Sequence, residues 1–373
     1  MMKRFFCVIM VLIMLVGCSP IEKGENKSAT NTKNVYVTGV WITYSELDGM
    51  LANGDFKNQF DEVLSNCKAH SITDVFVHTR AFCDAVYPSS YFPLRDSVKE
   101  YDFDVLEYMI TKCHENKIKF HAWINPYRVR TADSETSNLP SDSFVLDWLT
   151  DENTTNVCIF DGIYLNPASS EARQIIINGI REIVIDYAVD GIHFDDYFYP
   201  TQDELFAQKS YSDYCSNTQK PLAIDEWRRA NVNSLISGCF TAIKFTDADI
   251  IFSVSPSASI DENYNRHYAD IPLWIESGCV DCIIPQLYFG FDYPEDDYKF
   301  DNLIDTWQKV TKNSETKLLI GLAPYKIHTE TEPDNIEWKN GVNIIKRQTD
   351  ICKKSSYISG HIYFSYSAMC EYL

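Results

Sequence analysis

The sequence lacks the excess of basic residues that nucleic-acid binding requires. Lysine and arginine together number 33 against 53 aspartates and glutamates, which gives a formal net charge of −20 over 373 residues. Phosphate groups are bound by clusters of basic side chains. We therefore expect no nucleic-acid partner.

A glycine-rich turn after the first strand-like run is also missing. Doubly wound sheets that bind dinucleotides carry such a turn, because its backbone must approach the pyrophosphate closely. Its absence argues against that fold. No cofactor is expected.

Paired cysteines are scarce, although the chain has twelve cysteines. Only Cys279 and Cys282 form a C-x-x-C pair, and a zinc site would need a second pair or nearby histidines. The other cysteines are scattered through apolar stretches, so we expect buried small hydrophobic residues. His78, His193 and His361 lie on separate predicted strands. This scatter permits a metal-dependent hydrolase, but no metal site is predicted.

The apolar run near the N-terminus is short for a membrane-spanning helix. It covers Phe5–Val16, follows two basic residues and ends in the letters LVGC at 15–18. This ending resembles a bacterial lipoprotein box, which implies cleavage before Cys18 and a lipid on its thiol. An uncleaved anchor or an ordinary secretory signal is the alternative. We expect a signal peptide at 1–17, a flexible tether at 18–34 and one domain at 35–373. The protein is then exported and held at the membrane by the lipid.

Strand-like and helix-like runs alternate along the predicted domain. The predicted strands are 35–44, 72–79, 118–125, 189–194, 249–255, 281–288, 317–324 and 359–365. The predicted helices are 56–70, 103–116 (with Asp102 as its N-cap), 170–187, 222–245, 268–277, 297–311 and 336–353. This order predicts a parallel (β/α)8 TIM barrel. Because the chain stops soon after the eighth strand, the closing helix should be short or missing.

Long connections follow several of the predicted strands, and short ones precede them. The longest runs from Pro126 to about Asn166. Loops of this length in a compact domain are usually functional. In a barrel they all rise from the face that carries the active site.

The fourth predicted strand ends in the run from Val189 to Pro200, VDGIHFDDYFYP. In a strand of period two, His193, Asp195 and Tyr197 share one side and should face the barrel axis. Asp196 should face away unless the backbone turns there. An N-cap role for the following helix could explain Asp196 alone.

Polar and aromatic side chains follow the other predicted strands as well. Carboxylates, amides, guanidiniums and aromatic rings on one face suit a carbohydrate, whose hydroxyls need polar partners and whose C–H faces need flat apolar ones. Arg80 with Asp84 could instead be a structural ion pair, Asn125 a turn former, and Lys326 a Schiff-base lysine. The candidate substrate-binding residues are Arg80, Asp84, Asn125, Arg128, His193, Tyr197, Gln286, Tyr288 and Lys326.

Together these motifs resemble the bacterial glycosyl-hydrolase-like family 10 domain. The matching segments are GVWITY (39–44), HTRAFCDAVYPS (78–89), WINPYRV (123–129), YLNPASSEAR (164–173), DGIHFDDYFYP (190–200), IIPQLYF (283–289) and GLAPYKI (321–327). The resemblance implies a TIM-barrel glycoside hydrolase, with peptidoglycan glycan strands as the leading substrate. It also implies distant kinship to the α-amylase superfamily, in which the aspartate matching Asp195 is catalytic, and this implies that Asp195 is the nucleophile or an acid/base carboxylate. That superfamily takes its acid, a glutamate, from the fifth strand, and none stands in 249–255.

An adjacent pair of aspartates offers another mechanism. In substrate-assisted hydrolysis of 2-acetamido sugars, one carboxylate orients the acetamido group and the other acts as acid and base. We expect Asp195 and Asp196 to share these catalytic roles. Two alternatives remain. One is a non-catalytic glycan-binding lipoprotein on a TIM barrel, and the other is a barrel hydrolase such as a metal-dependent deacetylase.

Overall fold

The computed structural model describes residues 36–131, 139–151, 155–328, 335–339 and 341–373. Residues Tyr36–Leu373 form one unit. The predicted signal peptide, the lipid site Cys18 and the tether lie outside the described residues. Within the described part, no helix has both the length and the apolar character that crossing a membrane requires.

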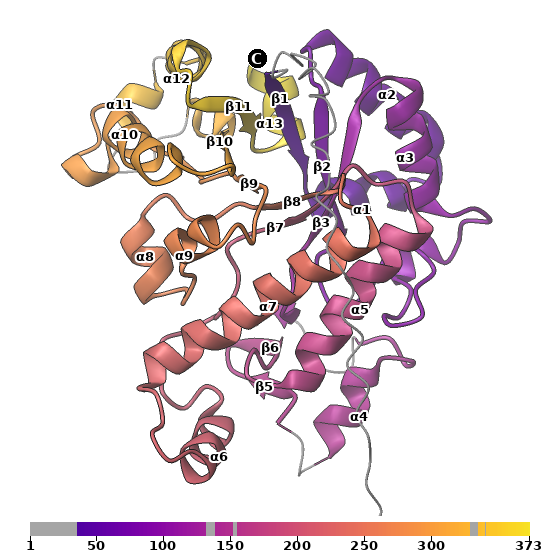
Figure 1. Cartoon of the computed structure of the whole chain (residues 1–373). Coiled ribbons are helices and arrows are strands. Elements are labelled where there is room, and N and C mark those ends of the chain that lie inside the picture. Colours follow the sequence, from indigo (N-terminus) through magenta and orange to yellow (C-terminus); the bar gives the residue numbers. More distant parts are fainter. Residues whose placement is uncertain (1–35, 132–138, 152–154, 329–334, 340) are drawn as a thin grey trace, which may run out of the picture. The chain divides into compact units, whose positions relative to one another are not determined.

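Eight parallel strands close into a barrel (Figure 1). Going round it, the order is β1-β11-β10-β9-β8-β7-β3-β2, so each strand pairs with its neighbours among the eight in chain order. The predicted (β/α)8 TIM barrel is confirmed. The barrel strands are β1 (Val37–Ile42), β2 (Asp74–Arg80), β3 (Lys119–Ile124), β7 (Gly191–Phe194), β8 (Ile251–Val254), β9 (Cys282–Ile283), β10 (Lys317–Leu322) and β11 (Ile358–Tyr363).

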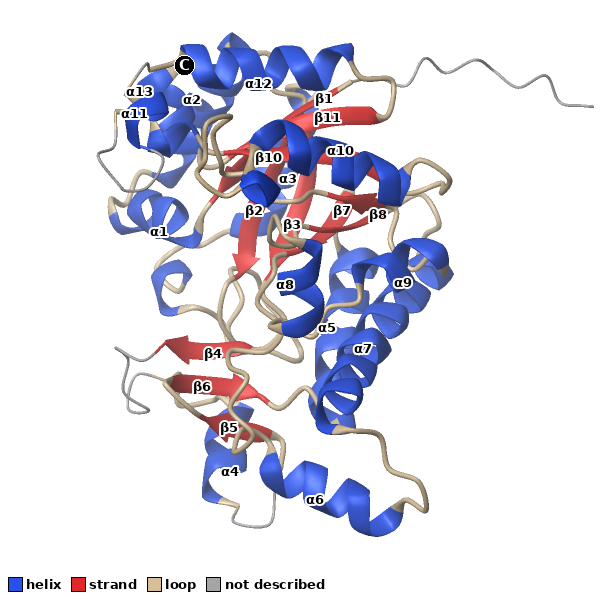
Figure 2. Cartoon of the chain, turned by 90° about the vertical axis from the view of Figure 1, so that its left-hand side faces the viewer, coloured by secondary structure: helices blue, strands red, loops and turns tan. Residues whose placement is uncertain are grey.

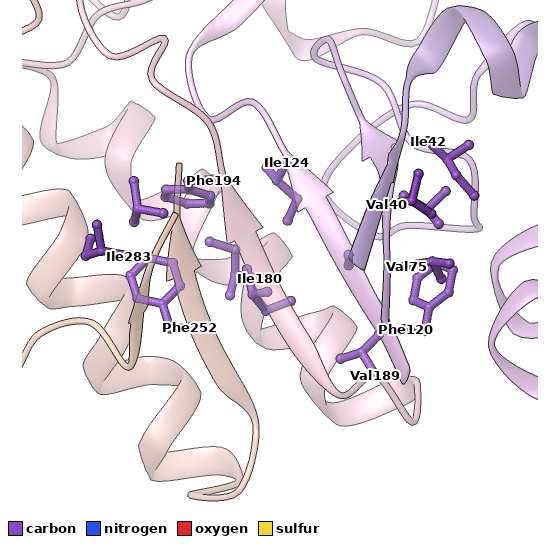
Figure 3. Packing of buried hydrophobic residues seen from close by; sticks show 14 of the residues in the cluster. Val40, Ile42, Val75, Phe120, Ile124, Ile180, Val189, Phe194, Phe252 and Ile283 are labelled. Atoms are coloured by element: carbon purple, nitrogen blue, oxygen red, sulfur yellow. The ribbon is translucent and has the colours of Figure 1, made fainter. Parts of the chain in front are cut away.

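Side chains alternate along each strand between two apolar clusters. One set points outward and packs under the helices, as Val40, Val75 and Phe194 do in Figure 3. The other set points inward and fills the barrel: Trp41, Phe76, Trp123, Cys282, Ile284, Leu319 and Ile362. The interior is therefore a packed core rather than a pore, as in other barrels of this kind.

Helices follow the strands and cover the barrel. They are α2 (Phe56–Ala69), α3 (Val105–Glu115), α5 (Ser170–Asp186), α7 (Ile224–Thr246), α9 (Ile271–Glu276), α10 (Phe300–Thr311), α12 (Asn343–Lys354) and α13 (Tyr366–Tyr372). The closing helix α13 is short, as expected. The predicted cap of α3 is wrong: the Asp104 side chain, not that of Asp102, accepts from the backbone N–H groups of Leu106 and Glu107.

The long connections contain structure that the sequence did not predict. Between β3 and α5, the chain forms an antiparallel sheet, ordered β4-β6-β5, together with α4 (Figure 2). These elements are β4 (Arg128–Thr131), α4 (Phe144–Thr150), β5 (Val157–Ile159) and β6 (Gly162–Leu165). Further short elements are α1 (Tyr44–Ala52), α6 (Gln208–Asn217), α8 (Ile260–Asn265), α11 (Asn335–Trp338) and the 3-10 turns η1 (Asp96–Val98), η3 (Asp296–Tyr298) and η4 (Pro324–Lys326).

The described cysteines are free thiols. Six of them are buried, at positions 67, 83, 113, 239, 282 and 352, which agrees with the prediction of small hydrophobic residues. Cys279 is partly exposed and Cys282 is buried inside the barrel, so the C-x-x-C pair is not a disulfide.

Candidate active site

A pocket of about 200 Å³ opens at the carboxyl ends of the barrel strands. Side chains from at least six strands or their following loops meet there, which is where active sites lie in this fold. Its walls combine two carboxylates with several aromatic rings. The lining residues are Trp41, Thr43, Tyr44, His78, Trp123, Arg128, Asp195, Asp196, Tyr197, Ser255, Gln286, Tyr288 and Phe364.

Asp195 is held in place by donors from the neighbouring strand. Its carboxylate accepts from the Trp123 indole N–H at 3.1 Å and from the Asn125 amide at 3.2 Å. The backbone N–H of Tyr197 donates at 3.3 Å. Asp195 is only 2% exposed, so its carboxylate keeps one orientation toward the pocket.

Asp196 lines the same pocket although it is the next residue in the chain. Strand β7 ends at Phe194, so the period-two alternation no longer applies to the two aspartates. The sequence had left this open, since a turn of the backbone was required. The turn brings both carboxyl groups to one cavity.

Both carboxyl groups bind protons more tightly than ordinary aspartates. Burial raises the pKa of Asp195 to about 6, the guanidinium of Arg128 opposes this, and the neighbouring Asp196 adds to it. Burial likewise raises the pKa of Asp196 to about 6, against the opposing effect of a hydrogen bond from Gln286. Near neutral pH the pair can therefore hold a proton on one member while the other is ionised.

His193 lies beneath the pocket rather than in its wall. It is fully buried, and its Nε2 accepts from the Trp41 indole N–H at 3.0 Å. The hydroxyl of Ser253 lies 2.8 Å from its Nδ1. Burial holds the pKa of His193 well below its usual value, so the imidazole is neutral. Its hydrogen bonds to Trp41 and Ser253 tie β7 to β1 and β8 directly below Asp195.

Arg128 contributes the cationic wall of the pocket. Its Cζ lies 5.2 Å from the Tyr197 ring centroid and 5.7 Å from that of Tyr44. Its Nε donates to the Ala81 carbonyl at 3.0 Å. Tyr197 is 58% exposed and stands at the rim.

His78 lines the pocket but was not among the candidate site residues. The ring is 2% exposed and stacks on Trp123 at 3.8 Å between centroids. Among the described residues, neither ring nitrogen has a hydrogen-bond partner. Burial lowers the pKa of His78 well below its usual value, so the ring is neutral.

Three further predicted site residues lie in the pocket wall or directly behind it. Gln286 and Tyr288 line the pocket, and the Gln286 amide donates to the Ser255 carbonyl at 3.1 Å. Asn125 is buried behind Asp195, and its side-chain oxygen accepts from the Arg128 backbone N–H.

Arg80, Asp84 and Lys326 are placed outside the pocket wall. The buried Arg80 guanidinium stacks on the Phe92 ring at 3.8 Å. Asp84 pairs at 3.1 Å with Arg95, so the ion pair considered between Arg80 and Asp84 is not the one that forms. The Lys326 ammonium lies 5.4 Å from the Phe289 ring, on η4.

Sequence reasoning missed much of the aromatic wall. The pocket residues absent from the candidate list are the ring-bearing Trp41, Tyr44, His78, Trp123 and Phe364, together with Thr43 and Ser255. Trp41, His78 and Trp123 have the inward parity of their strands, and this signal was available. Parity alone does not separate a pocket wall from the barrel core, because both face inward. Within the described residues, no group of three or more His, Cys, Asp or Glu side chains is arranged to hold a metal.

Comparison with known proteins places this sequence in a family. The model of the family described as glycosyl hydrolase-like 10 matches residues 36–339. The chain is 30% identical over 335 residues to the glycosyl hydrolase YngK of Bacillus subtilis, covering 83% of this chain and 63% of that protein. It is also 30% identical to the glycosyl hydrolase DigH of Escherichia coli K12, covering 81% of this chain and 73% of that protein. The chain thus spans less than two thirds of the Bacillus relative's length.

Solved structures share the fold at low sequence identity. The glycoside hydrolase domain of PgaB (BpsB) from Bordetella bronchiseptica superposes with a TM-score of 0.61 at 11% identity, covering 90% of this chain and 95% of that one. An α-L-fucosidase from Paenibacillus thiaminolyticus gives 0.58 at 13% identity, covering 90% and 48%. The family match supports a hydrolase that acts on glycans. By its sequence and its barrel, the chain belongs to the glycosyl hydrolase-like 10 family.

Proposed function

We propose that the protein is a glycoside hydrolase in which Asp195 and Asp196 form the catalytic pair. The observation that carries the proposal is the pocket itself, where two adjacent carboxyl groups share one aromatic-walled cavity and both have a pKa of about 6. Hydrolysis of a glycosidic bond needs a proton donor and a second group that stabilises the developing cation. A pair that titrates near neutral pH supplies both states at once.

The surroundings of the two aspartates favour different roles. Asp195 accepts hydrogen bonds from Trp123, Asn125 and the backbone, and these donors stabilise its ionised form. Asp196 faces the pocket beside Gln286 and is half-buried. We assign the ionised, orienting role to Asp195 and the role of acid, then base, to Asp196.

The mechanism that suits neighbouring carboxylates is the substrate-assisted one. The acetamido oxygen of the substrate attacks the anomeric carbon, while Asp195 holds the amide N–H and Asp196 protonates the leaving oxygen. Ionised Asp196 then removes a proton from water as the water oxygen attacks the anomeric carbon. The bond from that carbon to the acetamido oxygen breaks, and a free reducing end remains. This route does not use a glutamate at the end of β8, where Ser255 lines the pocket directly after the strand.

The substrate proposed is a glycan of 2-acetamido sugars, with peptidoglycan strands first. The aromatic wall of Trp41, Trp123 and Tyr288 provides apolar surface for the acetamido methyl group and the sugar C–H faces. We also propose that the protein is exported and anchored through lipid on Cys18. Replacing Cys18 with Ser should release it from the membrane fraction.

A digestion assay tests the proposed function. The protein would be incubated with purified peptidoglycan, glycan strands freed of peptides, chitin oligomers and α-glucans, with products identified by mass spectrometry. Fragments of 2-acetamido sugars should appear with the wild type and vanish with Asp195→Asn. If the glycan strands bind the protein but stay intact, the barrel is a glycan-binding module and the catalytic assignment is wrong.

A further inference from the structure

A second hollow lies beside the active-site pocket. It measures about 360 Å³ and is walled by residues of α1, η1, β4 and the loop after β2. We call it the side cleft and define it by Asp48, Phe82, Asp84, Arg95, Ser97 and Arg130. Nothing in the proposed hydrolysis uses these residues.

One layer of side chains separates the side cleft from the pocket. The Tyr44 ring, which lines the pocket, meets the Phe82 ring of the side cleft edge-on at 5.1 Å between centroids. Cζ of Arg128, in the pocket wall, lies 4.9 Å from the Phe82 centroid, and Cζ of Arg130, in the cleft wall, lies 5.4 Å from it. Arg128 and Arg130 flank the buried Val129 on β4. This strand therefore contributes one arginine to the wall of each hollow.

Four charged side chains of the side cleft form ion pairs with one another. Asp84 lies 3.1 Å from Arg95 and 3.6 Å from Arg130, with both the Asp84 and Arg95 side chains 7% exposed. Arg95 also reaches Asp48 at 3.3 Å. The carboxylate oxygens and guanidinium N–H groups of this wall match the hydroxyls of a neutral sugar, because each hydroxyl both donates and accepts.

We propose that the side cleft binds a second sugar of the same glycan chain. This inference rests on the proposed function and extends it. A chain seated in the pocket continues past Tyr44 and Phe82 into the cleft, so the enzyme acts on chains rather than on single sugar units.

A bulky residue placed at the cleft rim tests this proposal. Asp96 is exposed on η1 and lines the side cleft, so Asp96→Trp would fill it from outside. Asp297→Trp is the matched control, because Asp297 is an exposed aspartate on η3 that lines a different hollow of about 720 Å³ beside α8. In the described residues, that hollow shares no side chain with the pocket.

The readout is a ratio measured on the full chain. It compares kcat/KM for a hexasaccharide of 2-acetamido sugars with kcat/KM for a nitrophenyl glycoside of one such sugar. Asp96→Trp should lower this ratio about tenfold relative to the wild type, the cost of one lost binding contact of about 1.4 kcal/mol. Asp297→Trp should leave it within twofold. A ratio that stays unchanged in Asp96→Trp, or that falls equally in both variants, overturns the proposal.

A binding measurement separates this failure from failure of the proposed function. If the wild type cuts neither compound, the assignment of hydrolysis fails, but calorimetry with the hexasaccharide still examines the cleft. Asp96→Trp should then bind the hexasaccharide about tenfold more weakly than Asp297→Trp does. Equal affinity of the two variants rejects the side cleft as a sugar site.

Discussion

The fold destabilises the ionised forms of Asp195 and Asp196. Both groups titrate near 4 in an unfolded chain and near 6 in the folded protein, so folding favours their protonated forms. The stability that comes from this preference is complete below pH 4 and is lost as the pH rises through 6. Catalytic groups are commonly kept in such unfavourable states.

Replacing Asp196 with Asn should therefore stabilise the protein at neutral pH. The full pKa difference corresponds to about 3 kcal/mol, and partial exposure of Asp196 reduces this to about 1–2 kcal/mol at pH 7. At pH 3 the gain should disappear, because the wild-type carboxyl is then protonated in both states. Urea unfolding at the two pH values gives the comparison. Equal gains at both would show that ionisation is not the cause.

The hydrogen bond from Trp123 should set the pH at which kcat/KM falls on the acid side of the profile. Its indole N–H donates to Asp195 and lowers the pKa of that carboxyl. Trp123→Phe should move the acid limb of kcat/KM upward by about one pH unit, since a hydrogen bond to a charged group contributes about 1.5–3 kcal/mol. Trp41→Phe is the control, because the Trp41 indole donates to His193. A shift of the same size in the control would contradict the assignment.

His78 is expected to lower the free energy of unfolding while it contributes to the pocket wall. Its two ring nitrogens are buried without protein partners among the described residues, whereas the ring itself stacks on Trp123. His78→Phe keeps the stacking and removes both nitrogens. We expect unfolding to become about 1–3 kcal/mol less favourable and glycan hydrolysis to fall about tenfold. A destabilised variant would instead show that the imidazole serves the fold.

At the scale of elements, the alternation of side chains along β7 was predictable from the sequence. The small antiparallel sheet was not. Ile192 and Phe194 pack outward and His193 inward, as the alternation predicts. The small sheet was missed because β5 has three residues and β6 has four, too few for a period to be recognised. Asp84 was not paired correctly either, because its nearer partner Arg95 directly precedes η1 and its second partner Arg130 lies on that sheet.

Helix α5 contains a glycine that packing requires. A Cβ at Gly179 would lie 2.4 Å from the Phe92 ring and 2.7 Å from the Arg80 guanidinium. Gly179→Ala should therefore destabilise the protein by about 1–3 kcal/mol, although alanine is the better helix former. Gly49→Ala in α1 is the control: nothing lies within 4 Å of its Cβ, and a gain of up to about 1 kcal/mol is expected. Thermal unfolding of the two variants decides between propensity and packing, and equal signs would refute the packing argument.

At the scale of the whole molecule, the barrel could be predicted because its signal is repeated eight times along the chain. Each strand has an outward apolar face, and each following helix has a matching one, so errors of a few residues at the ends do not change the topology. The position of the site followed from the same rule. Part of its wall did not, because Tyr44 and Phe364 lie beyond the ends of β1 and β11, where the alternation of the strands no longer applies.

The most direct test of the central claim separates the roles of the two aspartates by leaving group. The rate of glycan hydrolysis is compared with that of an aryl glycoside whose phenol leaves without protonation, for Asp195→Asn and Asp196→Asn. Asp196→Asn should lose about 10²–10⁴-fold in kcat/KM on the glycan and keep most of its kcat/KM on the aryl glycoside, because kcat/KM reports the first step and only the glycan needs an acid there. Asp195→Asn should lose activity on both. Full glycan hydrolysis by Asp196→Asn would contradict the account.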